Sequence, residues 1–189
     1  VMQICKDRCG DCDKLVFLGD LMMHRSPKPT VLLALKELMT DISYLGYKIH
    51  IVRGNHDSVT KADDGVTALS LLKDKNIRVY TEYHEDHKNK WVFIPHYEDE
   101  ERIKEYLANV PEGYVVFGHF GYHGVLNSAG DADFELSVSD FKNPTILGHI
   151  HKAGRNGNVS VLGTPYTTNF GEAGKDCYYG VLSDTRLEK

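Results

Sequence analysis

Short apolar runs of strand length alternate with a helical pattern in the first part of the chain. Leu15–Leu18 and Tyr47–Val52 predict two strands. Between them, apolar residues recur at helical spacing, with Pro29 near the start of the predicted helix and Gly46 at its end. A strand–helix–strand unit of this length predicts parallel strands, because an antiparallel pair needs only a short turn. The residues after these two strands are therefore expected at one edge of a sheet.

The remaining chain continues with strands and helices and then with strands alone. A second helix is expected over Asp63–Lys75 and a third over Glu98–Val110, and Tyr83–Lys90 is expected to form a charged hairpin loop. A long connection is expected over Gly121–Asn143, and loops of that length are usually functional or mobile. Further strands are expected over Ile77–Tyr80, Trp91–Ile94, Tyr114–Phe117 and Thr145–Leu147, and antiparallel ones over Val159–Leu162 and Tyr178–Ser183. This order predicts an α/β fold in which two mixed β-sheets pack face to face with flanking helices.

Four of the predicted strands end in glycine followed by a polar residue. The sequences at these ends are Gly19-Asp20, Gly54-Asn55-His56-Asp57, Gly118-His119 and Gly148-His149-Ile150-His151. Side chains delivered at neighbouring strand ends are expected to converge. Carboxylate, amide and imidazole donors together suit divalent cations such as Mn, Fe or Zn.

These residues predict metal-assisted hydrolysis of a phosphoester. The carboxylate of Asp20 can bridge two cations, to which Asn55 adds a carbonyl oxygen, and His119, His149 and His151 add ring nitrogens. Such a pair of ions can clamp a phosphate and activate a water. His56 is expected to give a proton to the leaving oxygen, and Asp57 to orient its ring.

The other histidines carry weaker signals. His24 and His123 lie in loops beside the predicted ligand strands and are candidates for substrate contacts. For His84, His87 and His96 the sequence favours a structural or merely exposed role.

Composition bounds these interpretations. The 189 residues suggest one domain, and the net charge of −5 argues mildly against tight, non-specific DNA binding by this chain alone. No apolar run is long enough to span a bilayer and no signal peptide is visible, so a cytoplasmic protein without a membrane partner is expected. The C-x3-C-x2-C spacing of Cys5, Cys9 and Cys12 matches a radical-SAM iron–sulfur loop or part of a zinc site. A solvated loop in a reducing compartment is the favoured interpretation.

The motifs GD, GNHD, GH and GHxH, in this order from about Leu15 to Leu182, resemble the calcineurin-like metallophosphoesterase superfamily. The resemblance implies a four-layer sandwich in which Asp20 bridges both metal ions. It implies that Asn55, His119 and His149 complete one metal site and that His151 belongs to the other. His56 would be the general acid or the phosphate-stabilising residue.

Secondary motifs resemble the nuclease subunit of the SbcCD-type DNA-repair complex and the phage recombination endonuclease subunit. They are Val161–Tyr166, Asn169–Glu172 and Cys177–Leu182, together with Gly118-His119-Phe120 and the long loop. The resemblance implies a DNA nuclease core. Mn is the expected metal, with Fe, Zn, Mg and Ni as alternatives. The expected partners are DNA or another phosphodiester, an SbcC-type ATPase subunit and a second copy in a homodimer.

One family feature is missing from the sequence. The family opens with a strand ending in D-x-H, which supplies two ligands of the first metal, and no D-x-H precedes Asp20. We therefore expect a single domain over 1–189 that lacks its first strand, either as a fragment or as a genuine variant, and that has no C-terminal capping domain. We expect one firmly held ion, or none if the fold is incomplete, and weak activity. A second ion would have only Asp20 and His151 as ligands. The alternatives are a small phosphodiesterase or phosphatase acting on nucleotides or phosphoproteins, and a catalytically impaired member that serves as a binding module.

Overall fold

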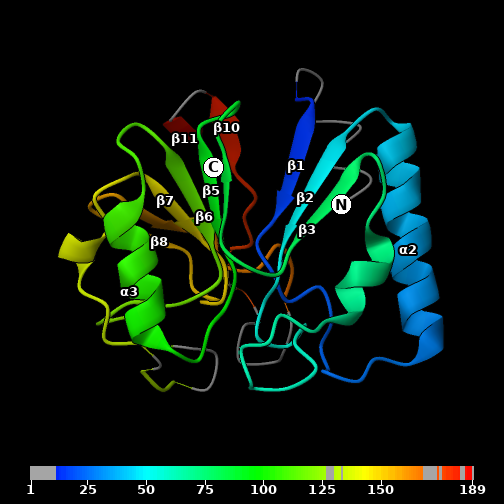
Figure 1. Cartoon of the computed structure of the whole chain (residues 1–189), viewed down its shortest axis with the longest axis horizontal. Coiled ribbons are helices and arrows are strands. Elements are labelled where there is room, and N and C mark those ends of the chain that lie inside the picture. The colour runs from blue at the N-terminus through cyan, green and yellow to red at the C-terminus, as the bar shows by residue number, and fades with distance from the viewer. Residues whose placement is uncertain are drawn as a thin grey trace.

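Two β-sheets that face each other form the frame of the protein (Figure 1). The computed structural model describes residues 12–126, 130–132, 134–167, 174, 176–183 and 186–188. Cys5, Cys9 and the motif Asn169–Glu172 lie outside the described residues.

The first sheet consists of β1 (Lys14–Phe17), β2 (Lys48–Val52) and β3 (Ile77–Tyr80), and both of its strand pairs are parallel. Helix α2 (Pro29–Tyr44) connects β1 to β2. Pro29 lies in its first turn, where the missing N–H costs nothing, and Gly46 follows its end at a φ of +97°. The predicted strand–helix–strand unit is therefore present with its parallel pairing.

The second sheet is mixed and has the order β4-β5-β6-β7-β9-β8. Its central pairs are parallel, and the edge strands β4 and β8 are antiparallel to their neighbours. Strand β4 takes residues that were expected in the hairpin loop Tyr83–Lys90, so the loop between β4 and β5 is shorter than predicted. A separate antiparallel pair is formed by β10 (Val181–Ser183) and β11 (Arg186–Glu188). The strands of the second sheet are β4 (His84–Asp86), β5 (Trp91–Ile94), β6 (Val115–Gly118), β7 (Thr145–Leu147), β8 (Gly154–Asn156) and β9 (Val159–Val161).

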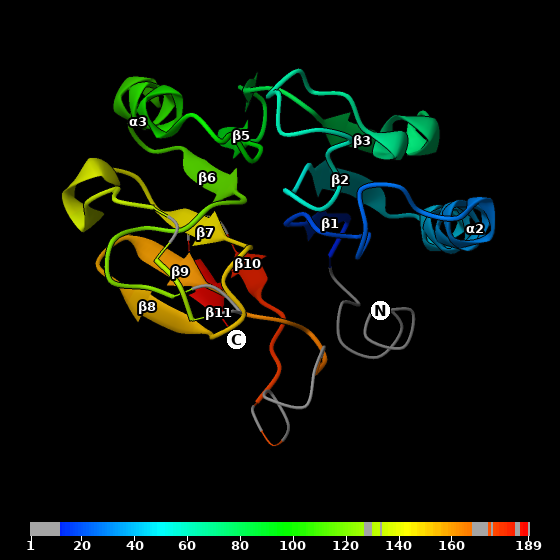
Figure 2. The same ribbon diagram turned by 90° about the horizontal axis from the view of Figure 1, so that it is seen from below.

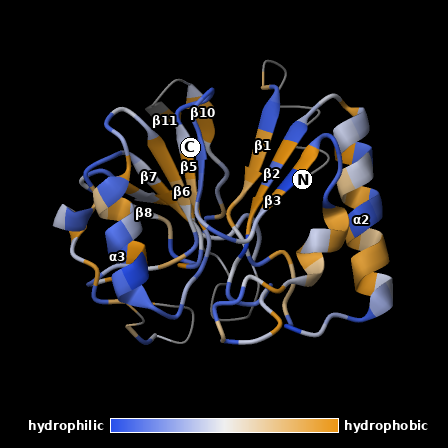
Figure 3. Cartoon of the chain, in the orientation of Figure 1, coloured by the Kyte–Doolittle hydropathy of each residue, from blue (hydrophilic) through white to orange (hydrophobic). Residues whose placement is uncertain are grey.

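Helices lie on the outer faces of both sheets, which gives the expected four layers. Figure 2 shows α2 outside the first sheet and α3 (Glu100–Asn109) outside the second. Strands β6 and β7 are mostly apolar, whereas α3 is largely polar (Figure 3). One buried apolar cluster joins the two sheets and consists of Val52, Tyr80, Phe93, Val115, Phe117 and Ile146. Two further clusters pack α2 and α3 onto their own sheets. Burial on both faces explains why β5, β6 and β7 read as continuous apolar runs.

The helix expected over Asp63–Lys75 is wrong in extent, because only the short 3-10 helix η1 (Ala68–Leu72) forms there. Asp63 has a φ of 52° and Gly65 a φ of 71°, which a right-handed helix excludes. The Asp64 carboxylate accepts a hydrogen bond from the backbone N–H of Val66. Such local bonds compete with helix formation.

Two expectations about strand pairing need correction. The strands near residues 160 and 180 do not pair with each other: β9 lies between β7 and β8, and β10 pairs with β11. In the described residues, the first sheet is purely parallel rather than mixed.

The long connection after Gly121 holds one short 3-10 helix, η2 (Val138–Asp140), among its described residues. None of the helices in the described ranges has the length and apolar character that crossing a membrane requires.

Candidate metal centre

Polar side chains meet where four parallel strands end. Asp20 follows β1, Asn55 follows β2, His119 follows β6 and His149 follows β7. The backbone turns sharply at two of these points, since Asp20 has a φ of 53° and His149 a φ of 70°. Residues other than glycine rarely adopt this left-handed conformation, and it is often found at functional sites.

The four side chains are close enough to share one ion. Asp20, His119 and His149 each offer a ligand atom within 4.8 Å of the other two. The amide oxygen of Asn55 lies 3.1 Å from Nε2 of His119 and 3.2 Å from Nδ1 of His149. One carboxylate oxygen of Asp20 lies 3.3 Å from Nε2 of His119. Two oxygens and two ring nitrogens thus point at a common centre.

His119 is oriented for ligation by a backbone carbonyl. Its Nδ1 bonds to the carbonyl oxygen of Leu18, the residue that follows β1. A carbonyl accepts and does not donate, so Nδ1 carries a proton and Nε2 faces Asp20 and Asn55. Histidine ligands of metal ions are commonly fixed in this way through their second ring nitrogen.

Two glycines allow the strand ends to approach closely. A Cβ added at Gly19 would lie 2.2 Å from Nδ1 of His119, and one added at Gly54 would lie 2.1 Å from a carboxylate oxygen of Asp20. Neither position has room for a larger residue. The glycines that precede the ligands are therefore required by packing around the site.

The electrostatics of the site favour a cation. Burial alone would raise the pKa of Asp20, but the charge and hydrogen bond of His119 outweigh it and hold the pKa below its usual range. Burial would likewise lower the pKa of His119, but Asp20 raises it overall. Asp20 is thus a carboxylate that draws positive charge, and a divalent ion meets the same demand.

Asp57 has a different partner from the one that the sequence suggested. Its buried carboxylate accepts hydrogen bonds from the backbone N–H groups of Asp20 (2.7 Å), Met22 (3.1 Å) and Gly54 (2.9 Å). Its oxygens are bonded to the loop after β1, through Asp20 and Met22, and to Gly54 after β2, rather than to the His56 ring. Burial, followed by the charge of Asp20, raises the pKa of Asp57 to about 6.

His56 lies at the exposed rim of the centre. Its backbone N–H donates to a carboxylate oxygen of Asp20 at 2.9 Å, and its Nδ1 lies 3.1 Å from the carbonyl oxygen of Met23. Its side chain is accessible to a substrate, whereas Asp20 is partly covered and His119 is buried.

The remaining predicted histidines lie outside this group of ligand atoms. His151 is half-buried and is not one of the three residues whose ligand atoms cluster. His24 is exposed, and His123 pairs with Glu135 at 2.8 Å. His84 is also exposed, and His87 lies 3.0 Å from the hydroxyl of Tyr114.

His96 is the residue at the centre that the sequence did not single out. It is buried, and its ring centroid lies 6.3 Å from that of His119 and 5.9 Å from that of His149. Burial, with the neighbouring histidines and Arg53, lowers the pKa of His96 to about 2, so the ring is neutral. The only sequence signal was its place after β5 and Pro95, without the glycine that marks the other strand ends.

The donor set fits a divalent cation of the Mn, Fe or Zn class. A hard carboxylate oxygen, an amide oxygen and two borderline imidazole nitrogens are already gathered around one point.

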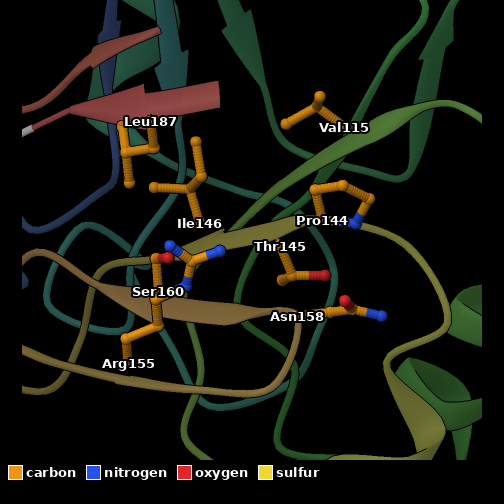
Figure 4. A pocket seen from close by; sticks show the side chains of 8 residues that line it. All are labelled: Val115, Pro144, Thr145, Ile146, Arg155, Asn158, Ser160 and Leu187. Carbon is orange, nitrogen blue, oxygen red and sulfur yellow. The ribbon is translucent and has the colours of Figure 1, made fainter. Parts of the chain in front are cut away.

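A separate pocket of about 190 Å³ shares no residue with this centre (Figure 4). Its walls include Val115 and Thr145, which begin β6 and β7, whereas the metal centre lies where these strands end.

Comparisons with known proteins agree with this geometry. The model of the calcineurin-like phosphoesterase family matches residues 2–170. A crystal structure with 15% sequence identity superposes with a TM-score of 0.52, covering 85% of this chain and 82% of that chain, and at this identity it supports the fold alone. No curated protein matches the sequence. With a family match over most of its length, the chain belongs to the calcineurin-like phosphoesterases, which are metal-dependent phosphoester hydrolases.

Proposed function

We propose that the protein is a metal-dependent phosphodiesterase of the nuclease type. The observation that carries the proposal is the convergence of Asp20, Asn55, His119 and His149 beneath an exposed His56. The four converging side chains would hold one ion. When bound, that ion supplies Lewis-acid activation of the phosphoryl group and of water.

The remaining chemistry belongs to His56. A protonated ring keeps its Nδ1–H on the Met23 carbonyl and can release its other proton from Nε2. The leaving oxygen of a phosphodiester needs such a proton, and a histidine is suited to give one near neutral pH. The hydrogen bond from the His56 backbone N–H to Asp20 holds the His56 backbone beside this metal ligand.

DNA is the proposed substrate because of the stretch after the last histidine motif. Gly163, Thr164 and Pro165 resemble the nuclease subunits of the SbcCD type. This stretch packs against the last histidine motif, since a Cβ at Gly163 would lie 2.8 Å from the carbonyl oxygen of His151. Mn is the proposed metal.

A small phosphodiesterase is the second candidate. The net charge of −5 favours it, because a phosphate backbone of many charges is attracted by basic surfaces. A short substrate with one phosphodiester needs only the local charge of the ion.

The test compares substrates with each metal. Linear duplex DNA, single-stranded DNA, bis-p-nitrophenyl phosphate and p-nitrophenyl phosphate are incubated with Mn²⁺, Fe²⁺, Zn²⁺, Mg²⁺ or Ni²⁺, with the His119→Ala protein as control. We expect Mn²⁺-dependent cleavage of DNA that the control lacks. Cleavage of the small diester without DNA cleavage would favour the second candidate. Metal binding without any hydrolysis would contradict both and favour a binding module.

A further inference from the structure

Two hydrogen bonds to Arg53, which follows a strand of the other sheet, hold His96 in place. Its backbone N–H donates to the carbonyl oxygen of Arg53 at 3.0 Å, and the guanidinium of Arg53 donates to the carbonyl oxygen of His96. Arg53 is only 1% exposed and follows β2, whereas His96 follows β5. This reciprocal bridge joins the ends of β2 and β5, which belong to different sheets.

The His96 ring is packed into the wall of the centre. Its side is covered by Phe134 from the long connection, at 5.9 Å between centroids and an interplanar angle of 82°. Phe134 also packs edge-on against His149 at 5.7 Å. With His119 and His149 on its other sides, the ring has little freedom to turn.

The ring nitrogens of His96 have no hydrogen-bond partner in the described part of the chain, although the residue is only 7% exposed. They are not fully enclosed, because Nε of Arg53 is the one side-chain polar atom among the described residues that is both enclosed and unpaired. The buried ring of His50, by comparison, is bonded within the protein, since its Nδ1 lies 2.7 Å from the hydroxyl of Tyr80. Because the His96 ring lies against His119 and His149, we expect its partner to be a group bound at the metal centre.

We propose that His96 is a further binding residue of this centre, whose ring N–H donates a hydrogen bond to a phosphoryl oxygen of the substrate. The inference rests on the proposed function in that it assigns a phosphoryl group to the site. A neutral imidazole has one N–H to donate, and burial strengthens its bond to an anionic oxygen. His96 is not itself a ligand of the ion in this arrangement, since it is outside the group of atoms within 4.8 Å.

The first test replaces His96 by Phe, which keeps a flat ring against Phe134 but removes both nitrogens. A hydrogen bond to a charged group is worth about 1.5–3 kcal/mol, so H96F should weaken competitive inhibition by inorganic phosphate by about 10–100-fold. The turnover of bis-p-nitrophenyl phosphate should fall by a similar factor. Mn²⁺ affinity, followed by electron paramagnetic resonance, should change much less than phosphate affinity, because no ligand is lost. The matched control is His50→Phe, a buried histidine stacked on Tyr80 and Phe93 rather than on the residues of the centre, which should leave phosphate inhibition unchanged.

The second test uses the unaltered chain and so does not depend on the folding of a variant. In protein with ¹⁵N-labelled histidine and loaded with Zn²⁺, inorganic phosphate should move the ring nitrogen resonance of His96 but not that of His50. Unchanged phosphate inhibition in H96F, or a His96 resonance that ignores phosphate, would overturn the proposal. A loss of Mn²⁺ affinity equal to the loss of phosphate affinity would also overturn it, since His96 would then only support the ligands. If the wild-type protein hydrolyses no phosphoester but phosphate still moves the His96 resonance, the proposed function fails and the assignment of His96 stands.

Discussion

Removing the Asp57 carboxylate should both destabilise the protein and disorganise the metal centre. The side chain is fully buried and accepts three backbone hydrogen bonds, from Asp20, Met22 and Gly54. Asp57→Ala leaves these N–H groups without their acceptor. A hydrogen bond to a charged group contributes about 1.5–3 kcal/mol, but water entering the space left by the carboxylate will partly replace it. We therefore expect a loss of about 3–5 kcal/mol in the free energy of unfolding, a large share of the 5–15 kcal/mol typical of a domain.

The assay is urea unfolding followed by circular dichroism, combined with Mn²⁺ titration. Asp57→Asn serves as the milder variant, because its amide oxygen can keep the bonds to Asp20 and Gly54 while the bond to Met22 is lost. It should lose less stability than Asp57→Ala. Asp99→Ala removes an exposed carboxylate that caps α3 through one bond to Arg102, and it should cost about 1 kcal/mol with metal binding intact. If Asp57→Ala unfolds at the same urea concentration as Asp99→Ala, the assigned role of Asp57 in holding the loop after β1 is wrong.

Three other predictions concern separate parts of the molecule. His56→Ala should lower the turnover of bis-p-nitrophenyl phosphate by about 10²–10⁴-fold while Mn²⁺ binding stays intact; equal losses of both would place His56 among the ligands. Gly54→Ala should weaken Mn²⁺ binding in a titration and destabilise the fold by about 1–3 kcal/mol, because its Cβ would collide with Asp20. Burial, then the charge of Arg78, lowers the pKa of His50 to about 4, whereas the unfolded value is about 6.5. Between these values the unfolded chain binds the proton, so the contribution of His50 is complete above pH 6.5 and is lost, by at most about 3 kcal/mol, as the pH falls toward 4. Urea unfolding of His50→Phe across this range should show a flatter pH dependence; an unchanged slope would contradict this reasoning.

Residues that follow apolar strands could be predicted from the sequence because the apolar runs and the glycine and proline residues that bound them indicate the same elements. Asp20 and Asn55 each follow an apolar run, partly buried in β1 and almost wholly buried in β2, and the helix between them is bounded by Pro29 and Gly46. The parallel pairing of β1 and β2 then places both side chains at one edge.

The parts that were missed depend on contacts between distant segments. The carboxylate of Asp57 is taken by backbone groups of the loop after β1, and no local pattern encodes that choice. His96 gains its setting from Arg53 and from Phe134, which come from another strand end and from the long connection. The helix expected near residue 68 failed for the converse reason, since the local bonds of Asp64 outweighed the apolar spacing.

The order in which the ligands occur along the chain sets when the protein can first bind an ion. Asp20 comes early and His149 late, and the sheets that carry them are joined by one apolar layer between β2, β3, β5, β6 and β7. Such long-range pairing forms slowly, because distant segments must meet before any contact compensates the lost chain entropy. During synthesis the nascent polypeptide therefore acquires its complete set of donors only after His149 has left the ribosome.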